Sequence, residues 1–249
     1  LLHEVQVPQV ARRSGGHPVA CGPVVRPAFA GSGTWSRRSA RKSLGLGDEQ
    51  RVALVVAGSW GVGQVERTVD GILGAPGYVP FVVAGHNERL RRSLSERCAA
   101  VNGAKVFGWV DDMERLVAAS DVVVENAGGL SAMEAMALGA PVVTYAPIAG
   151  HGRANAEEME RAGVSLYART KEELVAYLRL LSSGEAVRDE LVATARAMFR
   201  DDPARLIAVW AKAGRVFPVV PERPIAGASY ACPPSLMTKG SRSVLTTLQ

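Results

Sequence analysis

A strand, a glycine-rich turn and a helix follow one another over residues 122–138. The apolar run Val122–Val124 precedes Asn126–Gly129, and the apolar spacing from Ser131 to Leu138 is typical of a helix that stops at a glycine. A helix start presents unpaired N–H groups and the positive end of the helix dipole, and glycines let an anion approach the backbone. The sequence therefore favours an anion-binding turn. The alternative is a strand–helix unit of a parallel sheet whose glycines serve only close packing.

Glu134 lies about one turn further along this helix, where its carboxylate can reach a neighbouring hydroxyl group. A diphosphate joined to a polyol such as ribose fits a helix start and a carboxylate together better than a bare phosphate does. The first hypothesis is therefore a nucleotide or a nucleotide-sugar ligand.

Strand and helix patterns alternate from residue 51 onward, which predicts an α/β fold with a Rossmann-like parallel sheet flanked by helices. Strands are expected over residues 52–57, 80–84, 105–107, 121–125 and 141–145. Helices are expected from Val62 to Leu73 and over residues 88–100, 113–119, 131–138, 154–162, 171–181, 186–199 and 203–213. We expect residues 44–216 to form this domain, 1–43 to be a poorly ordered linker remnant, and 217–249 to be disordered.

A second glycine-rich turn, Gly58-Ser59-Trp60-Gly61, follows the first expected strand. On its own this string is weak, because it matches neither the GxGxxG spacing nor a phosphate-binding P-loop. In a parallel sheet, however, both glycine turns lie at the carboxyl edge, where ligands of open α/β folds bind. Two anion-tolerant turns on one edge strengthen the ligand hypothesis.

Further polar residues follow strands on the same edge. The segment after the strand 141–145 carries His151, Arg153 and Asn155, which can hydrogen-bond a sugar or a phosphate, and His86 follows the strand 80–84. A histidine in a loop is as readily a solvated side chain as a ligand contact. No Ser/His/Asp arrangement can be argued from the spacing, so no catalytic residue is predicted.

Composition excludes several classes of protein. The 249 residues carry a net charge of +5, and arginine clusters such as Arg37-Arg38 suggest solvated helix faces, with an anionic membrane surface as the alternative. Nucleic acid is disfavoured because aromatics make up only 6% and do not interleave with the basic clusters. Cys21, Cys98 and Cys232 lie too far apart for a disulfide framework or a zinc site, so a reducing cytoplasm is expected.

No metal or cofactor is predicted. The chain has no Asp-x-Asp motif to hold a divalent cation against a diphosphate, and helix dipoles with basic side chains can offset that charge instead. No apolar run approaches the roughly 20 residues of a membrane-spanning helix, and the N-terminus does not follow the order of a secretory signal.

Several segments in order resemble a known family. Trp109–Met113, Ala119–Val124 and Ala127–Glu134 are similar to the donor-binding half of GT-B glycosyltransferases of the MurG and monogalactosyldiacylglycerol synthase kind. The turn Gly58–Gly61 resembles the Gly-Ser-x-Gly turn of that family, and Pro147–Asn155 resembles its sugar-contacting loop. Cys21–Pro27 resembles the linker that enters the C-terminal domain, so the resemblance covers residues 20 to 215.

The resemblance implies a role for each matching residue. Val110 and Met113 would flank a uracil ring, and Glu134 would hold the ribose hydroxyls. N–H groups of the glycine turn would bind the diphosphate, Ser59 would lie near the phosphates, and His151 and Asn155 would face the donor sugar. The expected donor-binding residues are Gly58, Ser59, Gly61, Val110, Met113, Gly128, Gly129, Leu130, Ser131, Glu134, His151 and Asn155.

Two departures from the family pattern qualify this expectation. Ala154-Asn155 replaces the paired glutamines of the sugar loop, so N-acetylglucosamine is not assured as the donor sugar. The N-terminal acceptor domain with its candidate general base is not found in this sequence. We therefore expect an acceptor-binding domain or subunit as a partner, through a split enzyme or a truncated gene.

The expected function is transfer of a hexosyl or N-acetylhexosaminyl group from a UDP-sugar to a lipid-linked acceptor, without a metal. The expected place is the cytoplasm, peripheral to the cytoplasmic membrane face. The alternatives are a non-catalytic nucleotide-sugar-binding module and a UDP-sugar 2-epimerase-like protein.

Overall fold

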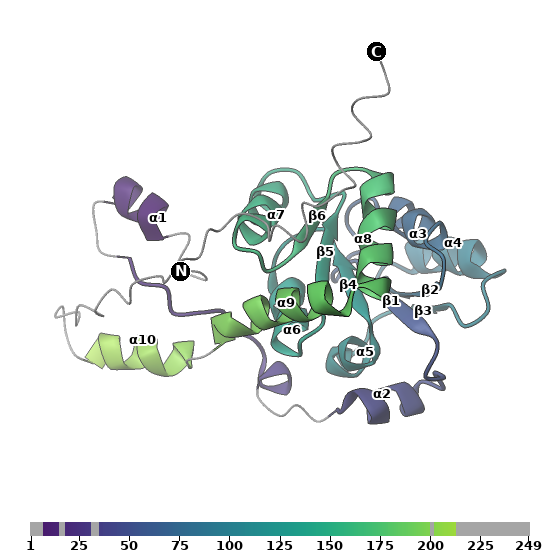
Figure 1. Cartoon of the computed structure of the whole chain (residues 1–249), viewed down its shortest axis with the longest axis horizontal. Helices are drawn as coiled ribbons and strands as arrows, with labels where there is room; N and C mark the ends of the chain where they lie inside the picture. Colours follow the sequence, from purple (N-terminus) through teal and green to yellow (C-terminus); the bar gives the residue numbers. More distant parts are fainter. Residues whose placement is uncertain (1–6, 15–17, 31–34, 200–201, 213–249) are drawn as a thin grey trace, which may run out of the picture.

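A computed structural model describes residues 7–14, 18–30, 35–199 and 202–212, and its centre is a six-stranded sheet in the order β3-β2-β1-β4-β5-β6 (Figure 1). All neighbouring strands run parallel. The strands are β1 (Arg51–Val56), β2 (Tyr78–Val83), β3 (Lys105–Phe107), β4 (Val122–Glu125), β5 (Val142–Tyr145) and β6 (Leu166–Ala168). The strand order reverses between β1 and β4, and such a switch point is where open α/β sheets bind ligands.

Helices bury both faces of the sheet. In β1 the side chains of Val52 and Leu54 join one core cluster, and those of Ala53 and Val55 join the other. This alternation explains why the strand is apolar throughout, because each of its faces is covered. The first cluster is covered by α5 (Met113–Ala119), α6 (Leu130–Ala137) and α7 (His151–Arg161). The second is covered by α3 (Val65–Leu73), α4 (Glu88–Cys98) and α8 (Lys171–Ser183).

Residues before the expected domain start at 44 belong to the same core. Phe29, in the short 3-10 helix η2 (Pro27–Phe29), and Ala40, in α2 (Arg37–Ser43), are 1% and 0% exposed and join the first cluster. Arg41 is buried and donates hydrogen bonds to the carbonyl groups of Ala119, Gly47 and Gln50. Arg41, which is close to Arg37-Arg38 on α2, therefore has a structural role inside the domain.

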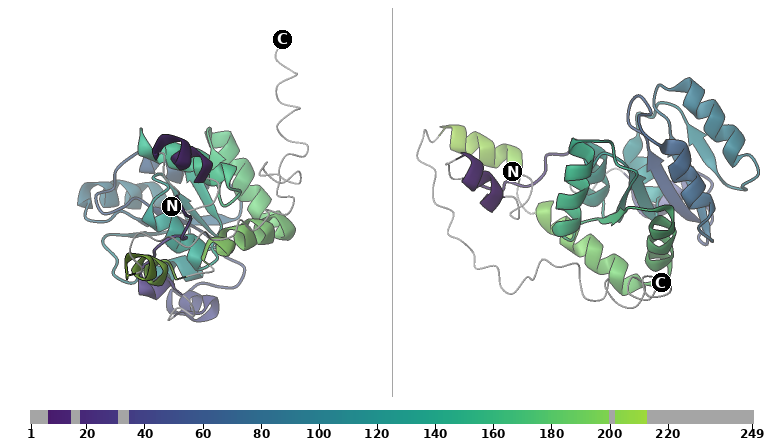
Figure 2. Two further views of the ribbon diagram at one scale, coloured as in Figure 1. Left: turned by 90° about the vertical axis from the view of Figure 1, so that its left-hand side faces the viewer. Right: turned by 90° about the horizontal axis from the view of Figure 1, so that it is seen from above.

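Four further helices complete the described part of the chain. They are α9 (Glu185–Arg196), η3 (Ala197–Phe199), α10 (Pro203–Lys212) and α1 (Val7–Ser14). Figures 1 and 2 show α1 and α10 away from the sheet. Within the described part of the chain, no helix is long and apolar enough to cross a membrane. The tail 217–249, predicted to be disordered, lies outside the described residues.

Candidate functional site

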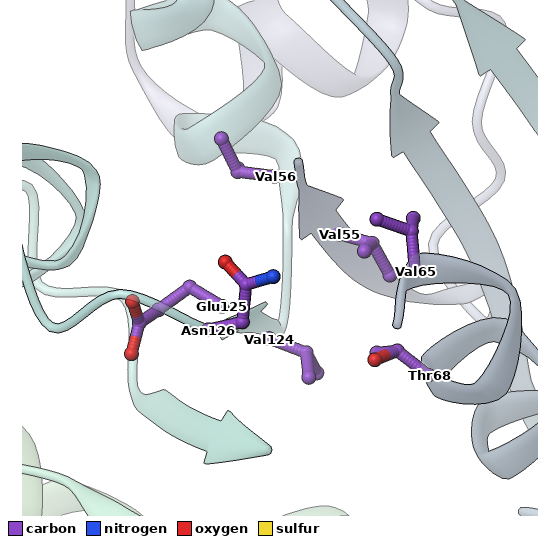
Figure 3. A pocket seen from close by; sticks show the side chains of 7 residues that line it. All are labelled: Val55, Val56, Val65, Thr68, Val124, Glu125 and Asn126. Atoms are coloured by element: carbon purple, nitrogen blue, oxygen red, sulfur yellow. The ribbon is translucent and has the colours of Figure 1, made fainter. Parts of the chain in front are cut away.

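The turns after β1 and β4 are neighbours at the carboxyl edge of the sheet. A small depression between them is lined by both strand ends and the start of α3, through Val55, Val56, Val65, Thr68, Val124, Glu125 and Asn126 (Figure 3). The Asn126 amide donates to the Val62 carbonyl at 2.9 Å, and the Ile148 N–H donates to the Asn126 carbonyl at 2.8 Å. Asn126 thus ties together the turns that follow β1, β4 and β5.

A buried carboxylate organises the turn after β4. Glu125 is 4% exposed and accepts hydrogen bonds from the N–H groups of Ala127 at 2.7 Å and Gly128 at 2.5 Å. It also accepts one from the hydroxyl of Thr144 on β5. In Figure 3 its carboxylate points away from α3. Burial raises the pKa of Glu125, while the three hydrogen bonds act in the opposite direction.

This network changes the expected role of Gly128. The resemblance assigned its N–H group to a diphosphate, but in the structure that N–H group donates to Glu125. Gly128 has φ +61°, and a Cβ there would come within 2.5 Å of the Asn155 Cβ, so the turn requires glycine. In the structure Gly128 allows the turn to adopt its conformation, and its N–H group is already bonded to Glu125.

The start of α6 leaves N–H groups free beyond Gly128. Gly129 is the N-cap, Leu130 is the first helical residue and is 53% exposed, and Ser131 is half-buried. Among the residues that the structure describes, no carbonyl or side chain accepts a hydrogen bond from these three N–H groups. An anion at this end of the helix would meet those groups and the positive end of the helix dipole.

Glu134, expected to reach a hydroxyl group of the ligand, is buried and already paired in the structure. Its carboxylate makes a two-pronged ion pair with Arg26, in which Nε lies 2.6 Å from Oε1 and Nη2 lies 3.1 Å from Oε2. The Glu134 side chain is 6% exposed and the Arg26 side chain 49%. The hydrogen bond to Glu134 raises the pKa of Arg26. A residue of the expected linker is therefore part of the site.

The turn after β1 is packed against the turn after β2. The His86 N–H donates to the Ser59 carbonyl at 2.8 Å, and the Asn87 amide donates to the Trp60 carbonyl at 3.2 Å. Gly85 fits only because it lacks a Cβ, which would overlap the backbone oxygens of Ser59 and Gly58. Gly58 and Ser59 are exposed and Gly61 is half-buried, so all three expected residues lie at the edge of the sheet.

Three aromatic rings gather beside this turn. His86 stacks on Trp109 with ring centroids 4.3 Å apart, and the Trp60 ring is tilted against His86 at a centroid distance of 5.7 Å. Trp60 and Trp109 are 71% and 52% exposed. Because these residues follow β1, β2 and β3, the stack extends the candidate site along the edge of the sheet.

Val110 and Met113 follow Trp109, a member of this ring stack, along the chain. Val110 is in the turn after β3, Met113 begins α5, and both are half-buried against the first core cluster. The structure thus brings the residues expected to flank a uracil ring to the same edge as the glycine turns.

His151 and Asn155 lie on a helix and not on the expected loop. The sequence predicted a helix from residue 154, but α7 begins at His151, with Gly150 at φ +81° as its N-cap. His151 is exposed, and the Asn155 amide donates to the Ala127 carbonyl at 3.2 Å. A second helix start therefore faces the carboxyl edge, and Asn155 supports the turn after β4.

Sequence reasoning missed Arg26, Glu125 and Asn126 as members of the site. Glu125 had a signal, because it is a carboxylate that closes an apolar strand. Arg26 had none, because its partner is 108 positions away. Within the described ranges, no group of three or more His, Cys, Asp or Glu side chains is placed to hold a metal ion.

Comparison with known proteins gives the same architecture. Residues 40–198 match the family described as Glycosyl transferases group 1. Processive diacylglycerol beta-glucosyltransferase of Bacillus mycoides (strain KBAB4) is 29% identical over 158 residues, which are 63% of this chain and 41% of that protein. The same enzyme of Bacillus cereus (strain 03BB102) is 29% identical over 157 residues, 62% of this chain and 40% of that protein. The chain thus spans about two fifths of the length of these relatives.

Two solved structures are similar in fold. That of WaaG, a glycosyltransferase involved in lipopolysaccharide biosynthesis, has a TM-score of 0.61 at 21% identity and covers 84% of this chain and 61% of its own. That of Anabaena Alr3699/HepE in complex with UDP-glucose has a TM-score of 0.56 at 19% identity and covers 76% and 53%. These similarities confirm the expected Rossmann-like domain, which is one half of a GT-B fold.

Proposed function

The chain belongs to the group 1 glycosyltransferases, and from that premise we propose that it binds a UDP-sugar as the glycosyl donor. The observation that carries the proposal is the α6 start at the switch point of the sheet, where the N–H groups of Gly129, Leu130 and Ser131 are free. The diphosphate would lie against this helix start, and Ser59 would approach it from the neighbouring turn.

The nucleoside would extend from the diphosphate toward β3. Glu134 would accept hydrogen bonds from the ribose hydroxyls, and Val110 and Met113 would flank the uracil ring. His151 and Asn155 at the start of α7 would face the sugar. In this arrangement the two helix starts offset the charge of the departing UDP, which is the charge that develops as the glycosidic bond breaks.

We further propose that the sugar is a hexosyl or N-acetylhexosaminyl group and that the acceptor is lipid-linked. Support comes from the diacylglycerol beta-glucosyltransferases that align with this chain over 41% and 40% of their length. Transfer also requires an oriented acceptor hydroxyl and a general base, which an acceptor-binding domain or subunit would supply. The reaction would take place at the cytoplasmic face of a membrane.

Titration calorimetry with UDP tests donor binding. The full chain should bind UDP equally well with and without EDTA, because the helix starts and basic side chains offset the diphosphate charge. Leu130→Pro should weaken binding, because proline lacks the N–H group at that position. Absence of UDP binding would contradict the proposed function, and binding lost on chelation would contradict the metal-free site.

Turnover separates this proposal from the alternatives. UDP-glucose, UDP-galactose and UDP-N-acetylglucosamine are incubated with membrane lipid extract and an acceptor-domain partner, and UDP release is followed with and without the extract. Lipid-dependent release supports a glycosyltransferase. Binding without release indicates a non-catalytic module, and an epimerised sugar indicates a 2-epimerase-like protein.

A further inference from the structure

We propose that Arg26 is a positioning residue of the ribose site, which orients the Glu134 carboxylate so that the site selects ribonucleotides over 2′-deoxyribonucleotides. This inference rests on the proposed function, since it assigns the ribose to Glu134. It adds to the site a residue that lies 108 positions away from Glu134 in the chain.

The ion pair leaves hydrogen-bond acceptor sites unused on the Glu134 carboxylate. An ionised carboxylate offers about four lone-pair sites on its two oxygens. Arg26 uses one on each oxygen, through Nε at 2.6 Å and Nη2 at 3.1 Å. One acceptor site then remains on each oxygen of Glu134. Two neighbouring hydroxyl groups, such as the 2′ and 3′ hydroxyls of ribose, match that pair of acceptors.

Burial makes the arginine necessary to this arrangement. The Glu134 side chain is 6% exposed, and a carboxylate that has lost water is stable in its charged form only when it is paired and hydrogen-bonded. A charged acceptor forms hydrogen bonds roughly twice as strong as a neutral one. Arg26 therefore supplies the partner that this buried acceptor requires.

Arg26 is itself fixed from several sides. Its guanidinium lies 4.9 Å from the ring centroid of Phe29, which is 1% exposed in the first core cluster. Glu114 on α5 adds a second favourable charge. Earlier in the same segment, Gly22 lies so close to the Met198 carbonyl that a Cβ would come within 2.6 Å of it. The guanidinium thus contacts the Glu134 carboxylate of α6 and the Phe29 ring, in a segment that also packs closely against Met198.

The placement agrees with the rest of the proposed donor site. Met113, the expected neighbour of the uracil ring, begins α5, the helix that also carries Glu114. Glu134 is on α6, whose start would hold the diphosphate. Arg26 is therefore bonded to the helix expected to bind the phosphates and feels the charge of Glu114 on the helix expected to bind the base, as a residue beside the ribose of a nucleotide would.

The test compares UDP with 2′-deoxy-UDP as calorimetric ligands of the full chain. In the wild type we expect UDP to bind more tightly. Arg26→Ala should lower the affinity for UDP by about tenfold or more, the size expected for hydrogen bonds to a charged group, and should change that for 2′-deoxy-UDP much less. Arg26→Lys should restore part of the discrimination, because an ammonium keeps the charge but cannot form the two-pronged contact.

Arg37→Ala is the matched control. Arg37 is also 49% exposed and pairs with a carboxylate, Asp121, at 2.7 Å, but on α2. Its loss should leave the UDP to 2′-deoxy-UDP ratio unchanged. In a Glu134→Gln background, Arg26→Ala should not alter the ratio further, because the two residues act as one unit.

Two results would overturn the inference. One is a rise in UDP affinity for Arg26→Ala, which would mean that Arg26 competes with ribose. The other is an unchanged ratio of the UDP and 2′-deoxy-UDP affinities, whether both fall equally or neither changes. If Arg26→Ala does not fold, as judged by circular dichroism, Arg26→Lys decides in the same way. A wild type that binds neither nucleotide would contradict the proposed function itself, whereas binding without these effects would contradict only the role of Arg26.

Discussion

The two glycine-rich turns at the switch point are held in place by different means. The turn after β1 is fixed by close backbone packing against the turn after β2, as the contact of Gly85 with Ser59 shows. The turn after β4 is fixed by hydrogen bonds to a buried carboxylate, Glu125. The first turn runs on to Val65 before a helix begins, whereas the second enters α6 directly at Leu130.

This difference shows that similar glycine strings serve unlike purposes. Only the turn after β4 presents a helix start to a ligand, so we expect it to contribute most of the affinity for an anion. The turn after β1 shapes the edge beside it and carries the exposed Trp60. The two turns should therefore differ in their contributions to stability, to ligand affinity and to pH dependence.

The largest effect is expected from Glu125→Ala. Its loss would leave the Thr144 hydroxyl and the N–H groups of Ala127 and Gly128 without an acceptor, which should lower the free energy of unfolding by about 3–5 kcal/mol. Urea denaturation measures this change. Glu125→Gln, which keeps the shape and one acceptor oxygen, is the control and should cost much less. A cost below about 1 kcal/mol for the alanine variant would show that the network does not hold the turn.

Gly85→Ala tests the packing that holds the other turn. Gly85 has φ +63°, and a Cβ would overlap the backbone oxygens of Ser59 and Gly58, so strain and overpacking together should cost about 2–4 kcal/mol. Gly58→Ala is the control, because Gly58 has φ +68° but open space around it, and should cost only about 1–2 kcal/mol. Equal losses in thermal or chemical denaturation would mean that the contact between the two turns contributes nothing.

Leu130→Pro tests which turn binds the diphosphate. Proline is tolerated at the first position of a helix, so the fold should survive, but the N–H group is lost. We expect UDP affinity to fall by about 1.5–3 kcal/mol, the range for a hydrogen bond to a charged group. Leu130→Ala keeps the N–H group and should bind as the wild type does. If both variants bind UDP unchanged, the anion does not lie at the start of α6.

The smallest effect is a pH dependence from Glu125. Its folded pKa is raised above the ordinary value of 4.5, so the stability linked to the protonated carboxyl is complete below pH 4.5 and is lost as pH rises through the folded pKa. Between the two pKa values, each pH unit should remove about 1.4 kcal/mol from the unfolding free energy of the wild type relative to Glu125→Gln. Denaturation series of both proteins across pH 4 to about 8 measure this difference. A constant difference would contradict the raised pKa.

Local patterns in the sequence predicted most of the sheet and the place of the glycine turns. The bounds of β3 and α5 agree with the prediction. The apolar spacing of α5 is regular, and β3 carries Val106 and Phe107 shortly after the turn residues Asn102 and Gly103. The strand β6 was missed, since Leu166–Ala168 is too short to show a period. The helix α2 was missed because one buried alanine, Ala40, stands among basic residues.

The connections within the site could not be predicted in the same way. Arg26 meets Glu134, and Asn126 meets Val62, across long stretches of chain, so no spacing rule applies to either pair. The role of Gly128 also depended on a side chain that precedes the turn. Sequence pattern fixes which residues reach the edge of the sheet, and only tertiary contacts decide which of their polar groups remain free.

The pairing of β1 with β4 also joins the two halves of the sheet across a long stretch of chain. Asp121 accepts the Val52 N–H although the two residues are 69 positions apart, and closing so long a loop is costlier and slower than forming the nearer pairs. Until that closure the two halves of the sheet present apolar strand edges, which are prone to pair with other chains. A ligand that contacts both glycine turns binds only after closure. Such a ligand would not speed this closure, but it would slow the reopening of the sheet and so lower the fraction of chains that expose these edges.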